Sequence, residues 1–254
     1  MTKALREAKI HSSWITPKAA YEEAVATYAS GLLDPESSKP FLENFLPFQE
    51  KVAAYGVVNS LAQTLLKITS SGVPDFYQGS EFWNLSMVDP DNRRPVDFKK
   101  RQQMLQEVAK MEPATGQNLL SKPQDGKVKL YLIFQALQAR QKEKALFAEG
   151  EYIPLKVEGT HKNHIVAFFR KKADTYALTV VPRLLASLTE GQVHKLGEIV
   201  WGDTCVRLPQ NAPSSWQNIF TEQQHRTENS DECRLGGSEL FSAFPVALLF
   251  SGGR

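Results

Sequence analysis

Carboxylate and guanidinium side chains gather in one short stretch of the chain, at residues 89–94. Asp89 and Asp91 offer hydrogen-bond acceptors, and Arg93 and Arg94 offer planar sets of donors. Sugar hydroxyls both donate and accept hydrogen bonds, so such Asp/Arg pairs can bind neighbouring hydroxyls. The same four residues could instead pair with one another in a turn stiffened by prolines. The stretch therefore predicts either a sugar-binding loop or a structural, salt-bridged turn.

Aromatic and polar residues lie immediately upstream of this stretch. Tyr77, Phe82 and Trp83 could stack on the apolar faces of sugar rings, or Phe82 and Trp83 could simply pack beneath the loop. Glu81 could be mistaken for a catalytic acid, because retaining transfer needs two carboxylates about 5 Å apart. We assign no catalytic residue here. The candidate substrate-binding residues of the loop are Tyr77, Gln78, Glu81, Asp89, Asp91, Asn92, Arg93 and Arg94.

A short strand is predicted to position this loop. Val73, Phe76 and Tyr77 have the side chains of a buried strand, and Gly72 and Gly79 punctuate its two ends. The polar candidates all follow the C-terminal end of this segment, so the strand would present them together at one edge.

A second compact group of candidates lies near the N-terminus, in the sequence KIHSSWITP. It contains His11, Ser13 and Trp14. His11 and Trp14 are candidates for contact with a substrate. The alternative is that this histidine is packed and hydrogen-bonded beside the tryptophan.

The sequence predicts no metal site. Asp89 and Asp91 have the spacing of a calcium loop, but Arg94 stands where that loop needs glycine. His161 and His164 lie three residues apart without a nearby Cys or Asp to complete a tetrahedral site. The glycine-rich motifs of nucleotide binding and the G-x-S-x-G motif of hydrolases are absent, so no cofactor is expected.

Helical patterns dominate the first part of the chain. Apolar side chains recur at helical spacing over residues 19–33, 40–70, 98–111 and 128–144. Pro47 falls inside the second of these helices and could kink it. One apolar stripe is predicted along that helix, formed by Phe41, Phe45, Phe48, Val52, Tyr55, Val58, Leu61, Leu65 and Ile68.

The pattern changes at about Glu151 to short segments rich in β-branched and aromatic residues. They are separated by clusters of Gly, Asn, Asp and Pro, which predicts an antiparallel β-sandwich. Residues 221–237 are polar and are predicted to be a loop or a hairpin tip. The predicted strand segments are HIVAFFR, TYALTVVP, IVWGDTCVRL, WQNIFTE and PVALLF.

Composition indicates a soluble globular protein. The chain has 254 residues, of which 42% are hydrophobic and 23% charged, and two domains are expected. Its net charge of +2 argues against a nucleic-acid partner. No apolar run is long enough to span a membrane, and the charged N-terminus does not resemble a signal peptide. Cys205 and Cys233 are too few for a disulfide scaffold, so we expect reduced thiols and a cytoplasmic location.

Four stretches carry a resemblance to a known family. GVPDFYQGSE and then DPDNRRPVDF, with REAKIHSSWITP upstream and a strand-rich region after FAEGEYIPL, resemble maltooligosyltrehalose synthases of the alpha-amylase superfamily. The resemblance implies an α+β fold. Residues 1–150 would be the mainly helical C-terminal remnant of a (β/α)8 barrel, with its last strand and sugar-side loop. Residues 151–254 would form a C-terminal antiparallel β-sandwich domain.

The family is expected to convert the reducing-end α-1,4 linkage of maltooligosaccharides to α,α-1,1, in trehalose biosynthesis. The reaction is an intramolecular transglucosylation through a covalent glycosyl-enzyme and needs no cofactor. The family's catalytic carboxylates lie in motifs N-terminal to the matched region, one of them in a His-Asp-Thr-Lys type motif. No His-Asp pair occurs in this sequence. We therefore expect this chain alone to be inactive.

The resemblance also favours roles for individual loop residues. Asp91 and Arg93 would contact glucose units on the donor side of the cleft, whereas Arg94 could equally order the loop. Glu81 would belong to the cleft wall.

Other interpretations remain open at the level of sequence. The chain could be a non-catalytic glucan-binding or structural module, or part of another glycosidase of the alpha-amylase superfamily. A maltooligosaccharide or glucan is the expected partner of the intact enzyme, with no nucleic acid and no membrane. Barrel helices with uncovered apolar faces predict self-association, with residues 1 to about 150 packed across a dimer.

Overall fold

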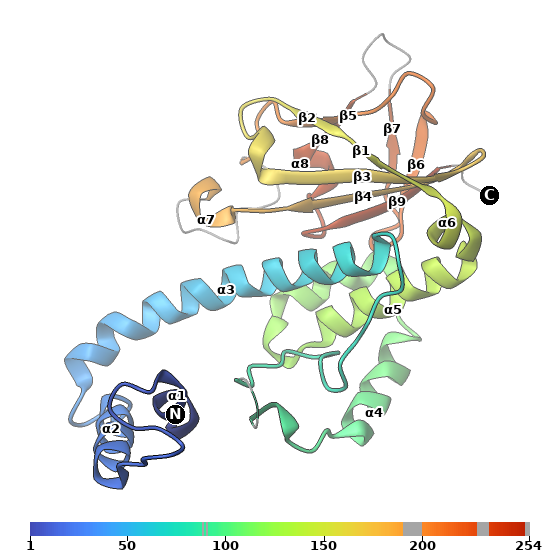
Figure 1. Ribbon diagram of the computed structural model, residues 1–254. Helices are drawn as coiled ribbons and strands as arrows, with labels where there is room; N and C mark the ends of the chain where they lie inside the picture. Colours follow the sequence, from blue (N-terminus) through green and yellow to red (C-terminus); the bar gives the residue numbers. More distant parts are fainter. Residues whose placement is uncertain (88, 90, 190–199, 228–233, 252–254) are drawn as a thin grey trace. The chain divides into compact units, whose positions relative to one another are not determined.

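The computed structural model describes residues 1–87, 89, 91–189, 200–227 and 234–251 (Figure 1). The chain divides into two compact units, Met1–Ala53 and Ala54–Arg254, and each is described by itself.

The first unit is helical. It contains α1 (Thr2–Ala8), α2 (Ala19–Leu32) and the first part of α3 (Lys39–Thr69). The helices predicted over residues 19–33 and 40–70 are confirmed to within one residue at each end. Pro47 lies inside α3, where its ring removes one backbone hydrogen bond.

The apolar stripe predicted along α3 is only half buried. Its second half is buried, from Tyr55 to Ile68. Its first half is exposed: 40% for Phe41, 38% for Phe45, 63% for Phe48 and 51% for Val52. Only the second half of the predicted stripe is therefore buried, and no described segment of the chain covers these four residues.

The second unit adds further helices to the end of α3. They are α4 (Phe98–Val108), α5 (Lys127–Lys142), α6 (Lys144–Glu149), α7 (Leu185–Leu188) and α8 (Gly237–Leu240). Short 3-10 helices lie at Asp91–Arg93, Pro113–Ser121, Pro123–Asp125 and Lys162–His164. The helices predicted over 98–111 and 128–144 are confirmed, except that each ends a few residues earlier and α6 follows as a separate helix.

Two antiparallel sheets complete this unit. One has six strands in the order β1-β3-β4-β9-β6-β7, and the other has three in the order β2-β5-β8. The first sheet is built from β1 (Glu151–Pro154), β3 (Ile165–Lys172), β4 (Thr175–Pro182), β6 (Ser215–Asn218), β7 (Gln224–Arg226) and β9 (Ala247–Ser251). The second is built from β2 (Lys156–Glu158), β5 (Cys205–Arg207) and β8 (Arg234–Gly236).

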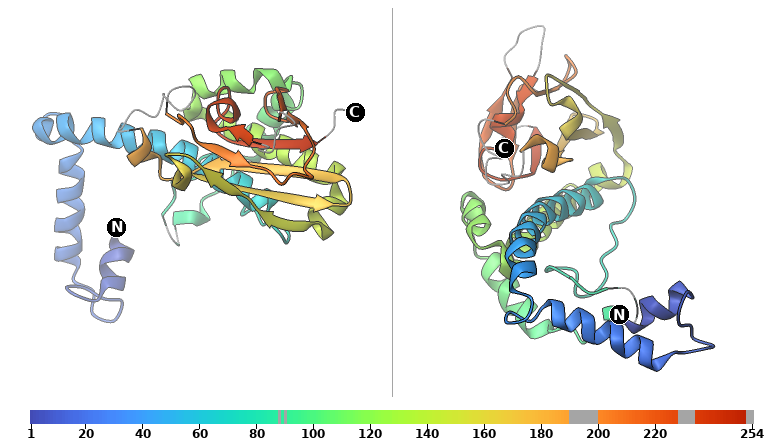
Figure 2. Two further views of the ribbon diagram at one scale, coloured as in Figure 1. Left: turned by 90° about the horizontal axis from the view of Figure 1, so that it is seen from above. Right: turned by 90° about the vertical axis from the view of Figure 1, so that its left-hand side faces the viewer.

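The central strands of the six-stranded sheet are buried on both faces. Successive side chains alternate between faces, so Leu178 and Leu249 join one cluster with Val206 of the smaller sheet. Leu248 points the other way and joins a second cluster with Leu61 of α3. Figures 1 and 2 show the second half of α3 and α5 lying along this face of the sheet. The sheet is therefore packed between helices on one face and the smaller sheet on the other.

Two predictions about local structure are wrong. The segment predicted as a strand between Gly72 and Gly79 is irregular, and Val73 is 93% exposed. A strand needs the backbone of a neighbour to pair with, and no described segment provides one here. Residues 221–237 are not a simple loop or hairpin tip, because they contain β7 and β8, which pair with different sheets. Residues 228–233 of that stretch lie outside the described part.

Candidate functional site

The candidate loop begins where α3 ends, and Arg140 of α5 joins the two. Its Nη1 donates to the carbonyl of Ile68 at 2.5 Å, and its Nη2 donates to the carbonyl of Gly72 at 2.5 Å. The last carbonyls of a helix lack partners within the helix, and a cation there also complements the helix dipole. Arg140 therefore fixes the point at which the chain leaves α3.

A second guanidinium lies at the same helix end. Arg170 of β3 is buried and donates to the carbonyls of Phe147 at 3.0 Å, Gly150 at 2.7 Å and Thr69 at 3.4 Å. Burial, together with the nearby positive charge of Arg140, lowers the pKa of Arg170. These bonds connect α3 and α6 to the sheet.

The middle of the loop is held by Arg101 of α4. Its Nε donates to Oε2 of Glu81 at 2.9 Å, and its Nη2 donates to the carbonyl of Gly79 at 2.9 Å. The same guanidinium lies 4.7 Å from the centroid of the Phe82 ring. Glu81 thus forms an ion pair that orders the loop. Sequence reasoning missed Arg101, whose only local signal is its place one turn after Asp97.

The aromatic residues of the loop divide into packed and exposed ones. Phe82 is buried, and Nε1 of Trp83 donates to the carbonyl of Pro123 at 2.5 Å, so both pack beneath the loop. Lys129 donates to the carbonyl of Phe82 at 3.2 Å, and burial, with the positive charge of Lys67, lowers its pKa. Tyr77, by contrast, is 54% exposed and leaves a ring face available.

The tip of the loop is a salt-bridged turn. Arg93 pairs with Asp89, and Arg94 pairs with Asp91 within and beside the 3-10 helix Asp91–Arg93. The backbone N–H of Met87 donates to Asp91 at 2.8 Å, and this bond, helped by Arg94, lowers the pKa of the Asp91 carboxyl. Both guanidiniums remain more than two thirds exposed, at 72% and 73%. Arg93 and Arg94 therefore pair with loop carboxylates while their side chains remain largely exposed to solvent.

Asn92, at the centre of that turn, differs from its neighbours. Its Oδ1 is buried and has no hydrogen-bond partner within the described residues.

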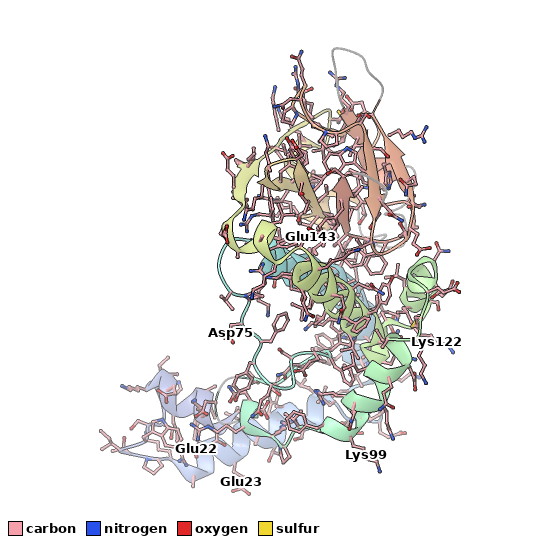
Figure 3. The ribbon with its side chains drawn as sticks, turned by 90° about the vertical axis from the view of Figure 1, so that its right-hand side faces the viewer. Glu22, Glu23, Asp75, Lys99, Lys122 and Glu143 are labelled. Atoms are coloured by element: carbon pink, nitrogen blue, oxygen red, sulfur yellow. The ribbon has the colours of Figure 1, made fainter. Side chains whose placement is uncertain are left out.

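Gln78 is exposed, like Tyr77 beside it. In Figure 3, Asp75 lies on the extended segment that leaves α3, and Lys99 lies on α4, which receives the chain after the loop. The eight loop candidates thus lie between these two helices.

His11 and Trp14 lie in the first unit and are held by neighbours there. The Trp14 indole donates to Glu7 at 2.9 Å, and the Arg6 guanidinium lies 5.0 Å from its ring centroid. His11 packs against the Tyr21 ring, with centroids 5.1 Å apart. Trp14 is nevertheless 53% exposed.

The first unit also contains a polar network that sequence reasoning missed. Arg6 donates two hydrogen bonds of 2.8 Å to the two carboxylate oxygens of Glu22, and Ser12 donates a third at 2.5 Å. The Arg6 and Ser12 hydrogen bonds lower the pKa of Glu22 to about 2. The network links α1, the following loop and α2.

Metal-binding clusters and membrane-spanning helices are absent from the described residues. The described part of the chain contains no group of three or more His, Cys, Asp or Glu residues that could hold a metal ion. None of its described helices is long and apolar enough to cross a membrane. Cys205 is buried in β5, whereas Cys233 lies outside the described residues.

Comparison with known proteins gives consistent matches over almost the whole chain. Proteins of two Mycobacterium tuberculosis strains, assigned by name to the maltooligosyl trehalose synthases, are 32% identical over 247 residues. The match covers 97% of this chain but 27% of theirs, so the chain spans about a quarter of the length of these curated relatives. No family model matches the sequence.

Solved structures agree with the sequence matches. The maltooligosyltrehalose synthase from Arthrobacter ramosus superposes with a TM-score of 0.78 and 30% identity, over 98% of this chain and 29% of that one. A Sulfolobus tokodaii protein described as a hypothetical maltooligosyl trehalose synthase gives a TM-score of 0.67 and 27% identity, over 98% and 28%.

Proposed function

We propose that this chain, which is homologous over nearly its whole length to maltooligosyltrehalose synthases, supplies the C-terminal part of such an enzyme. The observation that carries the proposal is the match to 98% of this chain and 29% of the Arthrobacter ramosus enzyme, at a TM-score of 0.78. The intact enzyme would convert the reducing-end α-1,4 linkage of a maltooligosaccharide to α,α-1,1 by intramolecular transglucosylation. It would act in trehalose biosynthesis.

In this proposal the chain shapes the cleft and does not perform the bond exchange. The catalytic carboxylates belong to the rest of the enzyme, so the isolated chain is inactive. The loop at residues 72–97 forms one wall of the cleft and helps to exclude water, so that the second sugar captures the transferred glucosyl unit.

The proposal divides the chain into two domains. Residues 1–150 form the end of a (β/α)8 barrel, and residues 151–254 form an antiparallel β-sandwich. The exposed segment after Gly72 supports the first part, because Val73 has a strand-forming side chain but pairs with no strand of the described residues. A buried cluster shared by the two sheets supports the second part.

Sugar contacts are proposed for the exposed groups of the loop. Tyr77 would stack on a glucose ring, and Asp91 and Arg93 would bind hydroxyls on the donor side. Gln78, Glu81, Asp89, Asn92 and Arg94 would line the same wall. His11 and Trp14 are proposed separately as substrate contacts of the first unit. The support is the exposure of Tyr77 and of both guanidiniums.

The test is a reconstitution. This chain is mixed with a polypeptide corresponding to the remaining N-terminal part of the Arthrobacter ramosus enzyme, and maltopentaose is supplied. We expect loss of reducing ends and a non-reducing product only when both polypeptides are present. Loss of reducing ends with this chain alone would show that it carries catalytic carboxylates, and would overturn the proposal.

A second candidate is a non-catalytic glucan-binding or structural module. It is favoured by the internal ion pairs of Asp89 with Arg93 and Asp91 with Arg94. Failure of reconstitution, combined with a folded chain that binds maltopentaose, would favour this module. Two further proposals accompany both candidates: self-association through exposed apolar helix surface, and a cytoplasmic location.

A further inference from the structure

Two adjoining hollows lie on the second unit, away from the loop at residues 72–97. Their volumes are about 520 and 290 Å³, and they share Ala139, Lys142 and Ile219. One wall is the outer face of the C-terminal half of α5. The smaller hollow is also lined by Gln217 of β6, by Phe250 and Ser251 at the end of β9, and by Thr175 at the start of β4. We call this combined feature the α5 groove. Its larger hollow falls within the size range of small-ligand sites.

Four primary amides contribute to the polar lining of the α5 groove. Gln135, Gln138 and Gln141 of α5 line the larger hollow, and Gln217 of β6 lines the smaller one. None of these four side chains has a hydrogen-bond partner in the part of the chain that the structure describes. Each amide offers an acceptor oxygen and two N–H donors. Each hollow therefore carries amide donors and acceptors that no described residue uses.

The rest of the lining favours a ligand that is both polyhydroxylated and apolar in part. Ala139, Ile219 and Phe250 supply apolar surface between the amides. Pyranose rings combine hydroxyl groups at the rim with C–H faces that pack on apolar side chains. Lys142, Glu143 and Asp174 bring one positive and two negative charges, and the small net negative charge does not select a strongly charged ligand.

We propose that the α5 groove binds a neutral oligosaccharide, and specifically an α-1,4-glucan chain, at a site separate from the candidate loop. The choice of an α-glucan rests on the proposed function, whereas the suitability for a neutral polyhydroxy ligand rests on the groove itself. Glu143 marks the position in Figure 3, where the end of α5 meets the sheet. A glucan held there would remain attached to the protein while its reducing end engages elsewhere.

The test follows backbone and side-chain amide signals of the full isotopically labelled chain during titration with maltoheptaose. We expect shifts at Gln135, Gln138, Gln141 and Gln217. The double substitution Gln138→Ala with Gln217→Ala should weaken this binding at least about tenfold, since each removes hydrogen bonds to hydroxyls. A second double substitution, Gln138→Ala with Gln141→Ala, changes only residues of α5. It should also weaken maltoheptaose binding.

The matched control is Gln103→Ala with Gln106→Ala, two exposed glutamines of α4 outside the groove. Equal weakening by the control pair would overturn the proposal, as would shifts confined to residues 72–97. Restored activity on reconstitution without any groove shifts would overturn this inference alone. Groove shifts without restored activity would support the groove and overturn the proposed enzyme role.

Discussion

Glu22 shows how a single carboxylate can hold short helices together. Its two oxygens accept from Arg6 and Ser12, and its side chain is only 8% exposed. Hydrogen bonds to the ionised form lower its pKa to about 2. The folded pKa lies below the unfolded value near 4.5, so the ionised network stabilises the fold above that pH. That stability is lost as the pH falls from about 4.5 toward 2.

We therefore predict that Glu22→Gln lowers the thermal midpoint at pH 6, because the charged pair with Arg6 is removed. The gap between wild type and variant should narrow as the pH falls from about 4.5 toward 2, because Glu22 protonates first in the unfolded chain and only near pH 2 in the folded one. Circular dichroism melts across this range measure the gap. The neighbouring substitution Glu23→Gln is the control, and a gap independent of pH would contradict the prediction.

The ion pair of Glu81 with Arg101 could not be predicted from the sequence. The two are 20 positions apart, and the contact exists because α4 folds back beside the loop. By contrast, the pairs of Asp89 with Arg93 and Asp91 with Arg94 are local, and sequence spacing was enough to suggest them. Local pairs could be predicted from the sequence, whereas a pair that depends on how distant elements pack could not.

At the scale of elements, α4 depends on its first turn. The Asp97 carboxylate accepts from the backbone N–H of Lys100 at 2.9 Å and caps the helix. We predict that Asp97→Ala lowers the free energy of unfolding by about 1 kcal/mol, measured by urea denaturation. Asp97→Asn keeps an acceptor oxygen and should lose less. Equal losses for the two variants would show that the cap is not the cause.

The junction of α3 with the loop gives a second prediction at this scale. Arg140 bonds two carbonyls at once, which the single ammonium of lysine cannot reproduce. Arg140→Lys should cost about 1–3 kcal/mol and speed amide hydrogen exchange near residues 70–73. The exposed Arg183 provides the control substitution Arg183→Lys. Unchanged exchange in the Arg140 variant would mean that the junction is held by other contacts.

The elements differed in how far the sequence could predict them. Helix α3 and strands β3 and β4 were predicted closely, because apolar periodicity and β-branched runs are properties of the segment itself. Residues 72–79 have the composition of a strand but form none, because strand formation also requires a pairing partner. Strand β7 was missed because all three of its residues, Gln224–Arg226, are polar. Strand β8 was missed because it is only three residues long and contains a glycine.

At the scale of the whole molecule, the exposed half of the α3 stripe predicts association. Phe41, Phe45, Phe48 and Val52 leave more apolar surface in water than isolated exposed residues usually do. We predict that the chain forms larger species at micromolar concentrations, and that Phe48→Glu with Val52→Glu shifts them toward monomer. Sedimentation velocity measures both.

The control for that experiment adds the same charge to the same helix elsewhere. Gln49→Glu with Ala53→Glu changes two other exposed positions of α3 and should leave association unchanged. A wild-type chain that stays strictly monomeric over the whole concentration range would rule out the association.

The position of β9 affects the order in which the second unit can form during synthesis. β9 pairs with β4 on one side and β6 on the other, so it joins the two halves of the six-stranded sheet. It is also the last strand in chain order, at Ala247–Ser251. On the ribosome, β3 and β4 can pair early, but their central neighbour emerges only after all the other strands. Until then the edge of β4 that later pairs with β9 has no partner strand. During this interval the nascent chain exposes an edge that a chaperone could bind and protect from aggregation.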